Sequence, residues 1–236
     1  MSSVQRPPNQ LLQALPPADF EALRPYLKPV DLPRDTVLAE AGTVLTQAYF
    51  PNAGVISIFV SLSEGQMIEV AMIGRDSLVG AVESFDDGVS VIEAVVLFPG
   101  SASTIDVTDF RTVAAQSAVL QNLLARHQQA LFVQAAQSGA CNASHSVEAR
   151  LARWLLRAHD LADGKPLPMT QELLARMIGV QRNAISIVAH ALQQAQIITY
   201  SRGNIEITDM EALRRTTCEC YPAVKARHQR LLGGSP

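Results

Sequence analysis

The sequence has no apolar run near the ~20 residues that a membrane-spanning helix requires. Residues 1–8 are polar and contain proline, so they do not predict a secretory signal. Charged residues make up only 17% of the chain, and the net charge of −3 argues against a protein that coats nucleic acid indiscriminately. These absences predict a cytoplasmic protein with no membrane partner.

Cysteine is scarce: the chain has three, an odd number with no disulfide framework, which favours a reducing compartment. Cys218-Glu219-Cys220 could supply metal ligands or a redox pair. No other cysteine or histidine lies close enough in sequence to complete a zinc set, so no metal site is predicted. Cys141, in a long helical segment, is interpreted as a packing residue.

The usual signatures of catalysis are also missing. We find no Ser/His/Asp set with suitable spacing, no glycine-rich phosphate loop and no paired carboxylates in a recognisable setting. Asp86-Asp87 is better interpreted as a turn. The sequence therefore does not predict an enzyme.

The acidic and basic residues are unevenly distributed. Residues 1–144 contain 7 basic and 14 acidic side chains, whereas residues 145–236 contain 12 and 8. An acidic body joined to a mildly basic C-terminal module is typical of a protein that contacts DNA through one part only.

Residues 170–190 predict two short helices separated by a tight turn. Their apolar residues fall at offsets that let two crossing helices share one small core. Thr170 is a suitable N-cap for the first helix, and Gly179 falls where the turn needs a positive φ. This is the helix-turn-helix pattern, although an ordinary helical hairpin is an alternative. Residues 197–208 predict a β-hairpin with Arg202 at its tip, and such a wing favours the DNA-binding interpretation.

Residues 30–161 contain two kinds of apolar pattern, one typical of strands and one typical of helices. Residues 30–107 contain short, partly alternating apolar runs separated by turn residues, for example the expected turn at 63–66, and predict an antiparallel sandwich or jelly-roll-like barrel. Residues 117–140 then predict one long helix, and residues 146–161 a second helix with Arg150, Arg153 and Arg157 on its outer side. The apolar stripe of the long helix suits either packing on its own barrel or a dimer seam. We favour the seam, formed by Leu120, Leu124, Leu131, Ala135 and Ser138.

This order of elements resembles the Crp/Fnr superfamily of bacterial transcription regulators, from about Leu11 to Asp209. The most specific part of the resemblance is Leu174-Ala175-Arg176-Met177-Ile178-Gly179-Val180-Gln181-Arg182-Asn183, followed by Ile197-Ile198-Thr199-Tyr200 and the wing. It implies an α+β fold: a double-stranded β-helix or jelly-roll domain like those that bind cyclic nucleotides (residues 1–115), a dimerisation helix (116–143) and a winged helix-turn-helix domain (144–236). It also implies a homodimer on a palindromic promoter site that touches RNA polymerase.

The cyclic AMP cassette of the family is not intact here. Members that bind cyclic AMP carry a Gly-Glu pair and, about ten residues later, Arg-Ser or Arg-Thr. The matching positions of this chain are Gly80, Ala81, Val91 and Ile92, which form the candidate effector pocket without the glutamate or the arginine. A buried phosphate without a cationic partner is expensive unless backbone N–H groups suffice. Cyclic AMP is therefore not expected.

Other family effectors are not expected either. The first cysteine is Cys141, so the N-terminal cluster of iron–sulphur sensors is missing, and residues 1–126 contain no histidine or cysteine to ligate haem. An unknown small organic effector would suit the apolar segments. No cofactor is predicted.

The resemblance assigns roles along the second helix and the wing. Arg182 is predicted to bind a guanine through its O6 and N7, which is worth ~1–3 kcal/mol of discrimination. Asn183 suits adenine, and Ile187 suits a thymine methyl group. The predicted base-reading residues are Arg182, Asn183, Ser186 and Ile187, and the predicted phosphate contacts are Thr170, Gln171, Gln181, His190, Ser201 and Arg202. The alternative function is a β-roll interaction module whose C-terminal domain no longer binds DNA.

Overall fold

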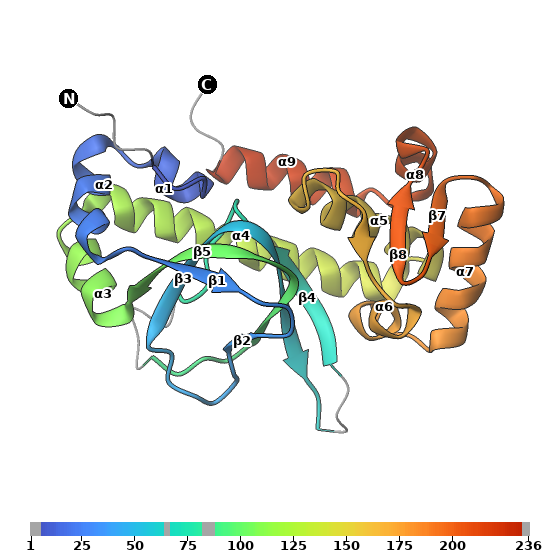
Figure 1. Ribbon diagram of the computed structural model, residues 1–236, viewed down its shortest axis with the longest axis horizontal. Helices are drawn as coiled ribbons and strands as arrows, with labels where there is room; N and C mark the ends of the chain where they lie inside the picture. The colour runs from blue at the N-terminus through green and yellow to red at the C-terminus, as the bar shows by residue number, and fades with distance from the viewer. Residues whose placement is uncertain (1–5, 64–66, 82–87, 233–236) are drawn as a thin grey trace. The chain divides into compact units, whose positions relative to one another are not determined.

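The computed structural model describes residues 6–63, 67–81 and 88–232 and has a mixed α/β fold (Figure 1). Its contacts divide the chain into two compact units. The first comprises residues 1–58, 73–132 and 228–236, and the second comprises residues 59–72 and 133–227. The predicted domain boundaries at residues 115/116 and 143/144 stay predictions. Among the described residues, no helix is long and apolar enough to cross a membrane.

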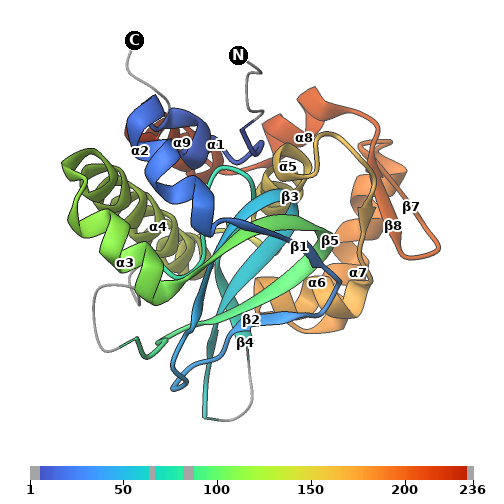
Figure 2. The ribbon, with the colours of Figure 1, turned by 60° about the vertical axis from the view of Figure 1, so that its left-hand side comes forward.

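An antiparallel β-roll occupies the N-terminal part of the chain, as predicted (Figure 2). The strands of its sheet have the order β1-β5-β3-β4, and β2 also pairs with β5. β3 and β5 cross so closely that a Cβ on Gly100 would lie 2.1 Å from the carbonyl oxygen of Ala53, which explains the glycine there. The strands are β1 (Lys28–Leu32), β2 (Val37–Ala39), β3 (Gln47–Ser61), β4 (Met67–Ile73) and β5 (Glu93–Asp106).

Short helices close the core of the first unit: α1 (Gln10–Ala14), α2 (Pro17–Leu23), the 3₁₀ helix η1 (Arg24–Tyr26) and α3 (Val107–Ala115). The side chain of Asn9 accepts hydrogen bonds from the first turn of α1 and donates to the carbonyl oxygens of Pro51 and Ser77. Phe50 of β3 meets Phe110 of α3 edge to face at a centroid distance of 5.6 Å. Buried leucines of α1 and α2 belong to the same apolar cluster.

The long helix α4 (Ala118–Ser144) is confirmed, but its predicted dimer seam needs correction. Leu120 and Leu124 pack in the apolar core of their own unit, and Ser138 is buried as well, while Leu131 and Ala135 are half-buried. Leu120, Leu124 and Ser138 therefore follow the alternative, a helix packed on its own chain, and a seam at Leu131 and Ala135 stays a prediction. A side chain that is already buried cannot serve as a contact for a partner.

In the second unit, α5 (Val147–Leu161) packs against α6 (Gln171–Ile178), α7 (Arg182–Gln194) and α8 (Met210–Thr216). The Oγ of Ser146 caps α5 by accepting from the N–H of Ala149. Arg150 was expected on the outer side of α5, but only 8% of it is exposed. Its guanidinium donates to the carbonyl oxygen of Ile178 at the end of α6, which explains why a charged residue is buried there. The last helix is α9 (Cys220–Leu232).

A three-stranded sheet completes the second unit in the order β6-β8-β7, with β6 (Leu167–Pro168), β7 (Ile198–Ser201) and β8 (Asn204–Ile207). The hairpin of β7 and β8 was predicted, but β1 and β6 were not. Of the expected turn at residues 63–66, residues 64–66 lie outside the described residues, as does Asp86-Asp87.

Candidate nucleic-acid interface

The turn between α6 and α7 has the geometry that the sequence predicts. Thr170 caps α6, because its Oγ1 accepts a hydrogen bond from the N–H of Leu173 at 3.2 Å. Gly179 ends α6 in the left-handed conformation, with φ of 69° and ψ of 47°. Leu174 and Ala175 of α6 are buried, as is Ile185 of α7. The two helices therefore share a core and leave one side of α7 free for contacts.

The exposed side of α7 carries three of the four predicted base-reading residues. Arg182 occupies the first helical position, and Asn183 follows it; both are exposed. Ile187 is 71% exposed, although an isoleucine usually lies in a core. The exposed polar residues Gln181 and His190 flank the same side, at the start of the helix and two turns further on. Because these exposed side chains do not pack in the core, they are available to contact base edges.

Ser186 and Gln171 contact each other, although the sequence assigned them separate roles. The Ser186 hydroxyl donates to Oε1 of Gln171 at 2.6 Å and also lies 3.2 Å from the carbonyl oxygen of Arg182. Ser186 is half-buried. To read a base it would have to give up these contacts, so its predicted role is weaker than that of Arg182.

The wing carries the remaining predicted phosphate contacts, Ser201 and Arg202. Arg202 and Gly203 form the tip between β7 and β8, with φ of 50° and 76°, the pair of positive values that a tight hairpin turn requires. Ser201 and Arg202 are exposed. Pro168 of β6 pairs with Asn204, and a Cβ on Gly203 would lie 3.9 Å from Cγ2 of Thr170. The start of α6 and the tip of the wing are therefore neighbours.

One predicted effector-pocket residue, Ala81, lies at a cavity. A cavity of about 480 Å³ in the first unit is lined by Ala81, Arg111, Ala115, Gln121, Leu124, Ala125 and Gln128. Gly80 is buried beside Ala81. Val91 is 82% exposed, and neither it nor Ile92 lines this cavity, so the pocket formed by these four residues stays a prediction. Apart from Ala81, the described lining residues come from α3 and α4.

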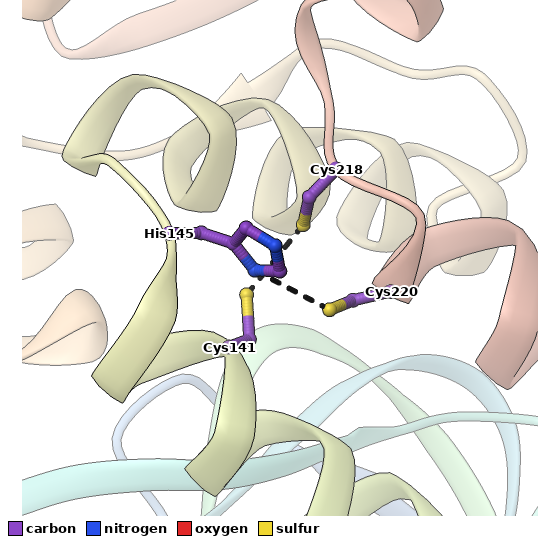
Figure 3. A group of neighbouring side chains, drawn as sticks. All are labelled: Cys141, His145, Cys218 and Cys220. Carbon is purple, nitrogen blue, oxygen red and sulfur yellow. Dashed lines mark hydrogen bonds between the residues drawn. The ribbon is translucent and has the colours of Figure 1, made fainter.

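The structure also brings together four residues that sequence spacing kept apart. Cys141, near the end of α4, and His145, just after it, lie beside Cys218 and Cys220 (Figure 3). Burial raises the pKa of the Cys141 thiol well above its ordinary value, which the nearby Arg153 guanidinium opposes. The sequence analysis looked for further ligands only near Cys218 and Cys220 in the sequence. It therefore missed Cys141 and His145, which lie close to them in space. A spacing of four between Cys141 and His145 on a helical segment is the signal that could have been used.

Comparison with known proteins identifies the C-terminal part. Residues 149–216 match the family model of the Crp-like helix-turn-helix domain, and this range includes most of α5, the helix-turn-helix and the wing. No curated protein sequence matches the chain.

Solved structures resemble most of the chain. A Crp/Fnr-family protein from Eubacterium rectale is 17% identical, with a TM-score of 0.70, over 87% of this chain and 96% of that one. FixK2 from Bradyrhizobium japonicum is 14% identical, with a TM-score of 0.69, over 81% and 98%. The c-di-GMP-responsive regulator CLP from Xanthomonas campestris is 14% identical, with a TM-score of 0.65, over 80% and 98%. The chain thus has the fold of Crp/Fnr regulators and carries a Crp-like helix-turn-helix domain at residues 149–216.

Proposed function

We propose that this protein is a sequence-specific DNA-binding transcription regulator of the Crp/Fnr type, which acts in the cytoplasm as a homodimer on a palindromic promoter site and touches RNA polymerase. The observation that carries the proposal is the exposed side of α7. Arg182 and Asn183 project from its first turn, and Ile187 lies one turn further along. An exposed helix face of this kind, within a Crp-like domain, fits the major groove.

The wing and the start of α6 supply contacts to the DNA backbone in this proposal. Thr170, Ser201 and Arg202 are exposed, and Gly203 at the wing tip lies close to Thr170, so the three side chains can contact phosphates together. Phosphate contacts orient the protein, whereas Arg182 and Asn183 specify the sequence. Gln181, Gln171 and His190 are proposed to help with orientation from α6 and α7.

Replacing Arg182 by alanine is expected to weaken binding to the native operator by ~1–3 kcal/mol, about 5- to 150-fold, because a bidentate contact to guanine is lost. The measurement is fluorescence anisotropy on DNA from the gene's own upstream region, with a scrambled duplex and two salt concentrations. Arg202→Ala is the matched control: it should weaken both duplexes similarly and reduce the salt dependence. A wild-type protein without preference between the duplexes, even with candidate effectors added, would favour a binding module without DNA-reading activity.

Independence from cyclic AMP is part of the proposal. Ala81 stands where family members that bind the nucleotide have a carboxylate, and Val91 is exposed rather than pocket-lining. Without the glutamate and the arginine of the cassette, a buried ribose hydroxyl and cyclic phosphate would lack hydrogen-bond and charge partners. Adding cyclic AMP to the anisotropy experiment should leave the dissociation constant unchanged. The cavity at Ala81 could accept another small effector, as CLP, a structural relative, responds to c-di-GMP.

The homodimer is proposed to form through the exposed side of α4 rather than through the seam that the sequence predicted. Exposed residues recur on α4 with alternating spacings of three and four, the pattern of a helix–helix seam. Most are small, Phe132 is 70% exposed, and a Cβ on Gly139 would meet nothing within 4 Å. Small residues let a second helix approach closely around the one aromatic. The seven are Asn122, Ala125, Gln129, Phe132, Ala136, Gly139 and Ala143.

Phe132→Glu is expected to convert the dimer into a monomer, because it would bury a charge at the centre of the seam. Sedimentation equilibrium over a range of protein concentrations measures the association constant. Val119→Glu changes a half-exposed apolar residue of α4 outside the stripe and should leave the dimer intact. A Phe132→Glu protein that remains dimeric would show that the two copies meet elsewhere.

A further inference from the structure

Four potential metal ligands from two distant parts of the sequence converge in the second unit. Cys141 lies in the last turn of α4 and His145 just beyond it, whereas Cys218 and Cys220 lie between α8 and the first turn of α9. Figure 3 shows the three sulphur atoms and the imidazole turned toward one common point. All four ligand atoms lie within 4.8 Å of one another, and the three cysteines are buried.

The distances between these ligand atoms fit a single tetrahedral ion. Sγ of Cys141 lies 3.6 Å from Sγ of Cys218, and Sγ of Cys220 lies 3.6 Å from Nδ1 of His145. Zinc bonds of about 2.3 Å to sulphur and about 2.0–2.1 Å to nitrogen give tetrahedral edges of roughly 3.8 Å between sulphurs and roughly 3.5 Å between sulphur and nitrogen. The separation of the two sulphurs is also far above the ~2.05 Å of a disulfide bond.

The surroundings of the four residues are those of a metal site. The imidazole of His145 faces Cys220 with Nδ1, and its Nε2 lies 3.3 Å from Oε1 of Glu219. A carboxylate on the second nitrogen fixes the ring's orientation and tautomer at metal-bound histidines. The side-chain amide of Gln137 donates to Sγ of Cys220 at 3.1 Å, as donors to ligand thiolates do. Neither contact is needed to pack three neutral thiols.

We propose that Cys141, His145, Cys218 and Cys220 bind one zinc ion. A Cys₃His set is a closed, four-ligand sphere with no open position, so the site is structural and not catalytic. Binding releases the three thiol protons to solvent. Three thiolates, one neutral imidazole and Zn²⁺ carry a net charge of −1, and the Arg153 guanidinium, which acts electrostatically on Cys141, offsets it. An iron–sulphur cluster needs its cysteines spread over several irons, and this set is too compact for that.

The ligands bracket the winged helix-turn-helix in the sequence. Two precede α5 and two follow α8, so zinc would join the ends of the segment that contains residues 146–217. Metal that binds only the folded state stabilises that state by its binding free energy. The site would therefore hold the DNA-binding part in its folded form, a role that stands whether or not the proposed function does.

Metal content and cobalt spectroscopy test the site. The full chain, without an affinity tag and under reducing conditions, should retain about one zinc per chain after dialysis. Removing zinc with a chelator and titrating Co²⁺ should give thiolate-to-cobalt charge-transfer bands and strong visible bands of tetrahedral Co²⁺, saturating at about one equivalent. Trp154 is the only tryptophan and belongs to the second unit, so its fluorescence reports the unfolding of that unit. The melting temperature measured in this way should be lower without metal.

Single variants separate this site from adventitious binding. Cys141→Ser, Cys220→Ser and His145→Gln should each remove retained zinc, whereas His159→Gln, a half-buried histidine of α5 outside the set, should not. Glu219→Gln should weaken zinc about 10- to 100-fold and keep the tetrahedral cobalt spectrum. Wild-type protein without zinc or thiolate–cobalt bands, or with iron in place of zinc, would overturn the proposal. α9 is also held by Tyr221 and Lys225, which both donate to Asp160, so loss of one ligand need not unfold the unit.

Discussion

Replacing Leu155 by alanine is expected to lower the free energy of unfolding of the second unit by about 2–5 kcal/mol. Leu155 is fully buried on α5, the helix that packs against α6, α7 and α8. The substitution removes apolar area from the core and leaves a cavity that three surrounding helices must share. Neighbours that are fixed by their own contacts collapse only partly into such a space, so we expect a value in the upper half of the range.

Trp154 makes this prediction measurable in one unit of the chain. It is the only tryptophan, it is buried on α5, and its Nε1–H donates to Oε1 of Glu69 at 2.8 Å. Its fluorescence in a urea titration therefore reports the unfolding of the second unit. Leu62→Ala, at a 44% exposed leucine of the same unit, should change the stability by less than about 0.5 kcal/mol. A Leu155 variant as stable as the Leu62 variant would mean that α5 is not the centre of this core.

The helix-turn-helix could be predicted because its information is local. Thr170 and Gly179 specify the ends of one helix through their own backbone preferences, and the apolar spacing of residues 174–188 specifies the shared core. The wing followed from two short runs and one turn with Arg202 at its tip. Each signal lies within one short continuous stretch of the chain, so no knowledge of distant partners is needed.

The parts that were missed depend on distant partners. β1 and β6 form by pairing with β5 and β8, and the two-residue β6 has no pattern of its own. Burial of Arg150 depends on a carbonyl oxygen 28 residues away, and the Cys/His cluster on residues 77 apart. The stripe on α4 was visible in the sequence, but a helix packed on its own unit and a helix in a dimer show the same periodicity.

Lowering the pH from about 7 to 4 is expected to cost the first unit roughly 3 kcal/mol of stability through His127 alone. Burial, assisted by the charge of His228 and opposed by that of Asp76, lowers the pKa of this histidine to about 4. The folded protein keeps His127 neutral, while the unfolded chain binds a proton below a pH of about 6.5. Between these two values the unfolded state is favoured progressively; below 4 both states are protonated and the loss is complete.

The hydrogen bonds of His127 explain why the neutral form is required. Its Nε2 lies 3.2 Å from the N–H of Leu78, which can only donate, and 2.6 Å from the Ser77 hydroxyl. Nε2 must therefore accept a hydrogen bond. In a protonated ring Nε2 carries a hydrogen, which would face the N–H of Leu78 with no acceptor between them. Among the described residues Nδ1 has no hydrogen-bond partner, so the ring gains nothing there in return.

His127→Gln removes this titration and should flatten the dependence of stability on pH between 6.5 and 4, by up to one proton in the slope. Urea unfolding at several pH values, followed by far-UV circular dichroism, measures the slope, and Trp154 fluorescence identifies the transition of the second unit. Above pH 7.5, where the imidazole is neutral in both states, variant and wild type should have parallel curves, whatever the cost of the substitution itself. Parallel curves down to pH 4 as well would mean that His127 takes up its proton in the folded protein, and that burial and the Leu78 N–H do not exclude it.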